Sequence, residues 1–130
     1  MVRNILITGG AGYIGSHVTE ILLKKLKKVF LLDNLSTGKK ENVEQFADRI
    51  EFVEGDIRSH HIVREAVEGV DFVLHQGALP SVPRSINDPI TTNEVNVTGT
   101  LNVLDAAKDA GVKRVVYASS SSVYGPDPVL

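Results

Sequence analysis

The sequence contains no cysteine and no tryptophan, and its formal net charge is only −2. Without cysteine it can form neither disulfide bonds nor thiolate metal sites, and the redox compartment is left open. The small net charge gives no electrostatic reason to expect a nucleic acid or an anionic membrane as a partner. No apolar run approaches the ~20 residues that a membrane-spanning helix needs. We therefore expect a cytoplasmic protein that binds neither nucleic acid nor membrane.

The length of 130 residues, with 42% hydrophobic and 23% charged residues, is ordinary for one soluble globular domain, which we assign to residues 1–130. The opening segment, Met1 to Thr8, has a short apolar run that leads into a glycine loop, so it predicts a first strand and not a signal peptide. The chain stops at Leu130 soon after a predicted strand, with no closing helix. We interpret this end as a truncation that removes a substrate-binding part.

Short apolar runs alternate with longer amphipathic segments, which is the pattern of βαβ units around a parallel sheet. Strands are predicted at residues 5–7, 29–32, 50–53, 71–75 and 114–118, and helical segments at 12–26, 42–47, 59–67 and 88–110. Right-handed crossovers then give a Rossmann-like, doubly wound α/β fold with strand order 3-2-1-4-5 and three layers, αβα. The fifth strand would be an exposed edge, through which two copies could pair as a homodimer.

Two of the helices carry a predicted buried face. In the first helix this face consists of Ile14, Val18, Ile21, Leu22 and Leu26, and in the long helix of Leu101, Leu104 and Ala107. The pair Asp88-Pro89 predicts the start of the long helix, and Gly111 predicts its end.

The segment from Thr8 to Gly15 separates the first strand from the first helix and is rich in glycine. Residues 10, 12 and 15 give G-x-G-x-x-G, and residues 9, 12 and 15 give G-x-x-G-x-x-G. In either register the glycines allow a tight turn, approach of the backbone to a pyrophosphate, and close packing of helix on strand. The helix N-terminus offers N–H groups and partial positive charge to the phosphates. The alternative is a tight turn that holds no ligand.

Asp33 ends the second strand, about 20 residues beyond the loop, where this fold places its ribose carboxylate. A carboxylate there accepts hydrogen bonds from both ribose hydroxyls and repels a 2′-phosphate. No arginine stands immediately beside Asp33, so the sequence favours NAD over NADP. The alternative is that Asp33 caps the turn that follows it.

Together with the loop, further stretches make the chain recognisable. They are DNLSTG at 33–38, GDIR at 55–58, HQGALPSVPRS at 75–85, NEVNVTGT at 93–100 and SSSSVYG at 119–125. Over essentially its whole length the chain resembles the extended short-chain dehydrogenase/reductases, and more narrowly the nucleotide-sugar 4-epimerases of the UDP-glucose or UDP-N-acetylglucosamine type. The resemblance implies the NAD-binding domain of a parent enzyme that interconverts nucleotide sugars at C4 by transient hydride transfer to NAD.

The resemblance also implies roles for individual residues. The cofactor-binding set is Gly9, Gly12, Tyr13, Ile14, Gly15, Asp33, Asn34, Ser36, Thr37, Gly38, Asp56, Ile57, Gln76, Gly77, Ala78 and Asn96. The substrate-facing set is Ser81, Val82 and Arg84, in a loop, and Ser120 is the catalytic serine, whose hydroxyl would bond the sugar O4. Structural alternatives remain open: an Asx turn at Asn34, a strand-end residue at Asp56, a helix-to-loop bond at Asn96, a solvated cation at Arg84 and a polar loop at Ser120.

The Tyr-x-x-x-Lys pair that the family uses for acid–base chemistry is absent: Tyr13, Tyr117 and Tyr124 are followed four residues on by His17, Ser121 and Pro128. Residues 120–122 also lack the Thr-Asp-Glu of related dehydratases, which argues against dehydration. Three interpretations follow. The chain is the NAD-binding half of a 4-epimerase-like enzyme, an engineered or truncated stand-alone Rossmann module without turnover, or a non-catalytic interaction domain that pairs through its fifth strand.

Other candidates for chemistry are weak, and no metal site is predicted. His60 and His61 are adjacent and cannot share a helix face as ligands. His75 belongs to the family's motif at the fourth strand, and we expect it to be packed or hydrogen-bonded. The lysines of residues 24–28 are expected to be solvated at a helix end.

Overall fold

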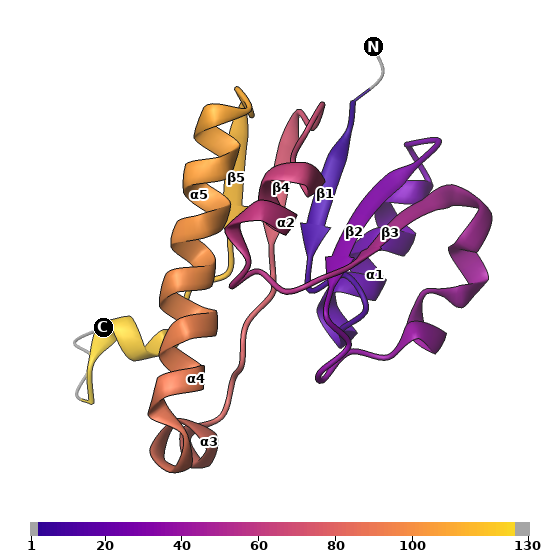
Figure 1. Cartoon of the computed structure of the whole chain (residues 1–130). Coiled ribbons are helices and arrows are strands. Elements are labelled where there is room, and N and C mark those ends of the chain that lie inside the picture. The colour runs from indigo at the N-terminus through magenta and orange to yellow at the C-terminus, as the bar shows by residue number, and fades with distance from the viewer. Residues whose placement is uncertain (1–2, 127–130) are drawn as a thin grey trace.

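The computed structural model describes residues 3–126, and its strands form one parallel sheet in the order β3-β2-β1-β4-β5 (Figure 1). The strands are β1 (Ile5–Thr8), β2 (Val29–Asp33), β3 (Ile50–Glu54), β4 (Phe72–His75) and β5 (Arg114–Tyr117). The predicted strands and their order are confirmed, and so is the Rossmann-like fold. The last residues, on which the interpretation of truncation falls, lie outside the described range.

The helices are α1 (Tyr13–Leu23), α2 (His60–Ala66), α3 (Val82–Asn87), α4 (Pro89–Asn93) and α5 (Gly99–Asp109). A π-helical segment, Glu94–Thr98, joins α4 to α5, so the predicted long helix is present with one wider turn in it. As predicted, Asp88 caps its start by accepting a hydrogen bond from the Thr91 N–H at 3.0 Å. Gly111 follows its end with a φ of +71°. The weak helical segment after β2 forms two 3-10 turns, Lys40–Asn42 and Glu44–Arg49.

The sheet lies between two helical layers, with α1 on one face and α2 and α5 on the other (Figure 1). The α1 side buries Ile7, Leu23, Val29, Leu31 and Val43. The α2 and α5 side buries a larger cluster that includes Leu6, Leu32, Val63, Val73 and Val103. Because the central strands are buried on both faces, they consist of consecutive apolar residues.

The predicted buried face of α1 is partly wrong. Ile14 and Ile21 are 60% and 59% exposed, whereas the buried positions of the helix are Gly15, Ser16, Thr19 and Leu23. At its start α1 lies so close to the loop after β1 that a Cβ on Gly15 would be 2.1 Å from the Gly9 carbonyl oxygen, so the buried face is small there and carries a leucine only at its far end, Leu23. The helix also ends at Leu23, earlier than predicted, and the Arg49 guanidinium donates to the Leu23 and Leu26 carbonyls beyond that end.

The predicted buried face of the long helix is also corrected. Leu101 and Leu104 are exposed. The buried residues, of which only Ala107 was predicted, are Val95, Gly99, Val103, Ala106 and Ala107. Small residues again face the neighbouring elements, here α2 and the sheet, because the helix lies close to them. The larger leucines are left on the outer side.

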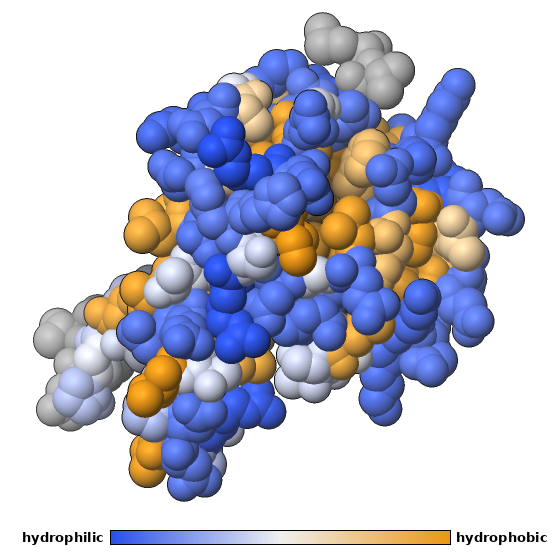
Figure 2. All heavy atoms as spheres, viewed as in Figure 1, coloured by the Kyte–Doolittle hydropathy of each residue, from blue (hydrophilic) through white to orange (hydrophobic). Residues whose placement is uncertain are grey.

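The sequence did not predict one short helix. Residues 82–87 were expected to be a loop, but they form α3, whose N-cap Ser81 accepts a hydrogen bond from the Arg84 N–H at 3.3 Å. With α4, this helix extends past the carboxyl ends of the strands (Figure 1). Hydrophobic side chains gather on the surface there, among them Ile86 and Ile90, each 72% exposed (Figure 2).

The predicted exposed edge is confirmed for β5, which pairs with β4 and ends the sheet. Val116 and Tyr117 on this strand are 50% and 57% exposed.

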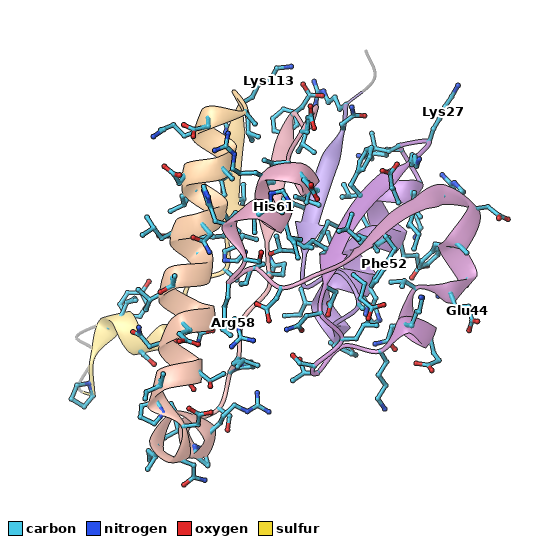
Figure 3. All side chains as sticks on the ribbon, in the orientation of Figure 1. Lys27, Glu44, Phe52, Arg58, His61 and Lys113 are labelled. Atoms are coloured by element: carbon cyan, nitrogen blue, oxygen red, sulfur yellow. The ribbon has the colours of Figure 1, made fainter. Side chains whose placement is uncertain are left out.

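The lysines of residues 24–28 are exposed, as expected. Lys27 and Lys113 lie at the end of the sheet opposite to Arg58 (Figure 3). Within residues 3–126, no helix combines the length and apolar character needed to cross a membrane.

Candidate functional site

A groove of about 700 Å³ lies at the carboxyl ends of the strands. Its walls come from segments far apart in the sequence: the loop after β1, the loop after β2, the segment after β3, the segment after β4 and the residues that follow β5. In an open parallel sheet, this edge at the point where the strand order reverses is where ligands bind. The volume is within the range of about 300–1,000 Å³ typical of small-molecule sites.

The glycine loop forms the floor of the groove, in the register of residues 9, 12 and 15, which line it. Gly9 has a φ of +69°, a backbone conformation that side chains disfavour. A Cβ on Gly15 would lie 2.1 Å from the Gly9 carbonyl oxygen, so only glycine permits this contact between helix and loop. The first-turn N–H groups of α1 have no acceptor within the helix and face the same end of the sheet. The arrangement suits an anion such as a pyrophosphate.

Asp33 lies beside this loop and is buried, with 8% of its surface exposed. Its Oδ2 accepts the Ala11 N–H at 2.9 Å, and its Oδ1 accepts the Leu35 N–H at 2.8 Å. The turn-capping alternative is therefore realised. Each carboxylate oxygen can accept a further hydrogen bond, so capping leaves acceptors for a ribose at the groove, which Asp33 lines.

The loop after β2 is held to the segment after β3 by polar side chains. Asn34 forms the Asx turn that was left open as its structural alternative, accepting the Ser36 N–H at 3.1 Å, and its amide donates to Asp56 Oδ2 at 3.0 Å. Arg58 donates to both Asp56 oxygens, from Nε at 3.1 Å and from Nη2 at 2.7 Å, and also contacts Glu94. These hydrogen bonds from Arg58 lower the pKa of Asp56 to about 2. The carboxylate is thus ionised at neutral pH, and these hydrogen bonds hold it where it lines the groove.

The segment after β4 is tied to the long helix through Asn96. Its side-chain Oδ1 accepts the Leu79 N–H at 2.8 Å and its Nδ2 donates to the Leu79 carbonyl at 3.1 Å. The helix-to-loop alternative for Asn96 is therefore what the structure shows. Asn96 does not line the groove, but Leu79 does.

The structure brings most of the predicted cofactor residues together. The groove is lined by Gly9, Gly12, Tyr13, Ile14, Gly15, Asp33, Asn34, Ser36, Thr37, Gly38, Asp56, Ile57, Gln76, Gly77 and Ala78, together with Arg84 from the substrate-facing set. Bare backbone at the glycines, a helix N-terminus and a carboxylate at the end of β2 fit the phosphates and a ribose of a dinucleotide. The predicted cofactor residues therefore fit NAD.

Three predicted residues of the substrate side are not brought to the groove. Ser81 and Val82 lie at the start of α3, away from the groove lining. Ser120 follows β5 and is exposed; its hydroxyl donates to Ser122 Oγ at 3.1 Å, while its neighbours Ala118 and Ser119 line the groove instead.

Several lining residues were not predicted. They are Leu32, Gly55, Arg58, Leu79, Pro80, Asp88, Thr91, Val95, Ala118 and Ser119. Gly55 and Arg58 belong to a stretch already recognised, and the ends of β2 and β5 could have pointed to Leu32 and Ala118. Val95 also belongs to a recognised stretch, at 93–100, whereas Thr91 carries no such signal, because its place depends on how the long helix packs.

His75 is packed and hydrogen-bonded, as predicted, and His60 and His61 meet carboxylates. His60 and His61 open α2, where they meet Asp105 and Glu65 at 3.1 and 3.2 Å. His75 is 5% exposed and hydrogen-bonded on both sides of its ring. Among residues 3–126, no group of three or more His, Cys, Asp or Glu side chains is placed to hold a metal ion.

Comparison with known proteins extends this picture. A putative UDP-glucose 4-epimerase of Methanocaldococcus jannaschii is 40% identical over 123 residues, which cover 93% of this chain and 39% of that relative. The UDP-glucose 4-epimerase of Thermotoga maritima, solved with UDP-glucose, superposes with a TM-score of 0.90 at 33% identity, over 98% of this chain and 41% of that one. The UDP-glucose 4-epimerase of Thermus thermophilus, solved with NAD, gives a TM-score of 0.81 at 42% identity, over 91% of this chain and 38% of that one.

The chain thus spans about two fifths of the length of these relatives. The family described as "NAD dependent epimerase/dehydratase family" matches residues 5–129, nearly the whole sequence. The match includes the glycine loop, Asp33 and every strand of the sheet. The chain belongs to the NAD-dependent epimerase/dehydratase family.

Proposed function

We propose that residues 1–130 form an NAD-binding domain that holds the dinucleotide in the groove at the carboxyl ends of the strands. The observation that carries this proposal is the pairing of the glycine loop with Asp33, whose carboxylate holds that loop at Ala11 and lines the same groove. Phosphates would lie at the N-terminus of α1, a ribose at Asp33, and the adenine beside Asp56 and Ile57.

The residues proposed to bind the cofactor are the predicted ones that line the groove. Asn96 would contribute indirectly, because its side chain holds the backbone of Leu79, which lines the groove. Bound NAD would supply a hydride acceptor. The nucleotide sugar of the parent enzyme would meet Arg84, whose guanidinium suits a phosphate, and Ser120, Ser81 and Val82 stay part of the proposed substrate side although they do not line the groove.

We propose that the parent enzyme interconverts nucleotide sugars at C4. The support is the similarity to two proteins named UDP-glucose 4-epimerases, one of them solved with UDP-glucose and the other with NAD. Because the sequence lacks a Tyr-x-x-x-Lys pair, the 130-residue chain is expected to bind NAD without turnover. The test is an assay of the purified chain with NAD and UDP-glucose: no UDP-galactose is expected, and measurable conversion would contradict the expected lack of turnover in this chain.

A second proposal concerns self-association through β5. The strand ends the sheet, and Val116 and Tyr117 are half exposed on it. Unpaired strand edges favour pairing with another chain. Sedimentation velocity at rising concentration is expected to show a dimer that Val116→Lys abolishes, and a clean monomer at high concentration would contradict this.

A cytoplasmic location is proposed on the ordinary composition of the chain, with 23% charged and 42% hydrophobic residues. Recovery of the native protein in the secreted or membrane fraction of its cells would contradict it.

A further inference from the structure

His75 connects the sheet to the long helix, and the residue that follows it, Gln76, lines the groove. Its Nδ1 lies 2.6 Å from the Thr8 hydroxyl oxygen at the end of β1, and its Nε2 lies 2.9 Å from the Thr100 hydroxyl oxygen on α5. The ring is 5% exposed, so these hydroxyls are its hydrogen-bond partners in place of water.

The neighbouring hydrogen bonds determine where the ring proton lies. The Thr100 hydroxyl donates its one hydrogen to the Asn96 carbonyl at 2.8 Å, so its oxygen is left to accept from Nε2–H. Thr8 Oγ1 accepts the Gly77 N–H at 3.1 Å, which leaves its hydrogen free to be donated to Nδ1. A neutral ring protonated on Nε2 therefore satisfies every group in the chain of hydrogen bonds.

Among residues 3–126, the side-chain hydrogen-bond partners of the ring are the hydroxyls of Thr8 on β1 and Thr100 on α5. Tyr117 is its register partner on β5. None of these three side chains is a carboxylate or a basic group. Burial lowers the pKa of His75 below the ordinary value of about 6.5. Among residues 3–126, the histidines that meet a carboxylate are His60 and His61.

Both ends of this chain of hydrogen bonds reach the groove. At one end is Gly77, which lines it. At the other is Asn96, whose side chain holds the backbone of Leu79, another lining residue. Ala78 lies between the two fixed points and faces the groove as well.

We infer that His75 is a positioning residue of the cofactor site. As a neutral ring protonated on Nε2, it fixes the segment from Gln76 to Leu79 against the glycine loop. This inference rests on the proposed binding of NAD, but the tautomer and charge of the ring can be measured without any ligand.

The first test is a long-range ¹⁵N–¹H correlation spectrum of the uniformly ¹⁵N-labelled chain, with the His75 signals identified by their loss in His75→Gln. The expected result is an unprotonated Nδ1 and a protonated Nε2, with a ring pKa below the ordinary value of about 6.5 because the ring is buried. A proton on Nδ1, or a ring pKa at or above the ordinary value, would overturn the inference.

The second test compares substitutions on α5 by titration calorimetry with NAD. Thr100→Val removes the acceptor for Nε2–H and is expected to weaken NAD binding about tenfold, a change of the size of one hydrogen bond. Thr100→Ser keeps the hydroxyl and is expected to retain both the affinity and the Nε2–H tautomer. Thr98→Val, at an exposed position of the same long helix, is the matched control and should bind as the unaltered chain does.

A folded Thr100→Val variant that binds NAD as tightly as the unaltered chain would overturn the positioning role. If Thr100→Val does not fold, His75→Phe replaces it in the comparison, because a phenyl ring neither donates to Thr100 nor accepts from Thr8. If the unaltered chain itself does not bind NAD, the proposed function fails, and the tautomer spectrum still decides the hydrogen-bond assignment.

Discussion

The carboxylate of Asp33 accepts a hydrogen bond from the backbone N–H of Ala11 at 2.9 Å, so the end of β2 holds the loop that follows β1. The other oxygen accepts the Leu35 N–H and holds the next loop. One buried side chain therefore shapes two walls of the groove and still presents oxygen acceptors to it. This double role makes Asp33 the most informative position to change.

Substitution of Asp33→Asn is expected to weaken NAD binding by about 10- to 100-fold, because hydrogen bonds to a charged group contribute about 1.5–3 kcal/mol. The amide nitrogen that replaces one oxygen cannot accept from Ala11 or from a ribose hydroxyl. Titration calorimetry measures the change. Asp48→Asn, at an exposed position before β3, is the matched control, and equal affinities for the two variants would contradict the assigned role.

Gly15→Ala is expected to lower the free energy of unfolding by about 1–3 kcal/mol, the usual cost of overpacking. The added Cβ would lie 2.1 Å from the Gly9 carbonyl oxygen, so α1 or the loop must move. Urea denaturation followed by circular dichroism gives the difference, with Glu20→Ala on the exposed side of α1 as control. Unchanged stability would show that the close contact of helix and loop is not required.

The Asp56–Arg58 pair is expected to give a stability contribution that depends on pH. The folded pKa of Asp56 is lowered from 3.8 to about 2, so the unfolded chain binds the proton more readily and acid favours unfolding. The contribution is complete above about pH 4 and is lost as the pH falls toward 2. Because Arg58 is 39% exposed, we expect about 1 kcal/mol after solvent screening.

The measurement is urea unfolding of the unaltered chain and of Arg58→Gln between pH 7 and pH 3. The difference in unfolding free energy should shrink as the pH falls through about 4. A difference that stays constant over this range would mean that the carboxylate is not stabilised by Arg58.

The corrected face of the long helix predicts opposite outcomes for two neighbouring positions. Val103 is fully buried and Leu101 is 63% exposed. Val103→Ala is expected to cost about 1–3 kcal/mol of unfolding free energy, and Leu101→Ala less than about 0.5 kcal/mol. Urea denaturation of both variants tests this, and a larger loss for Leu101→Ala would restore the face predicted from the sequence.

The sequence patterns were sufficient for the sheet because its signals are local. A strand buried on both faces requires a continuous apolar run, as at 29–32, and the tight turn after β1 requires glycine. The order of the strands then follows from right-handed crossovers. The same local signals placed Asp33 at the groove, since the carboxyl end of a strand is fixed once the strand is known.

The helix faces could not be predicted in the same way. A period of 3.6 residues shows which side chains share a face but not which face lies closest to the sheet. In α1 and α5 the close approach selects small residues such as Thr19 and Ala106, and it leaves Ile21 and Leu101 outside. That choice depends on distances between elements, which the sequence does not display.

The polar network at the site was foreseen only in part. Asn96 and His75 were recognised as motif residues, but their partners Leu79, Thr8 and Thr100 lie 17 to 67 positions away in the sequence. These pairs form because β1, β4 and the long helix meet at one edge of the sheet. For Ser120 the motif was recognised, but the structure does not place its side chain in the lining of the groove.

The most direct test of the central claim is a calorimetric titration of the purified 130-residue chain with NAD, with NADP titrated in parallel. Saturable binding of NAD with one site per chain is predicted, and weaker binding of NADP, because Asp33 repels a 2′-phosphate. No heat of binding at millimolar NAD, with the chain shown to be folded by circular dichroism, would contradict the account.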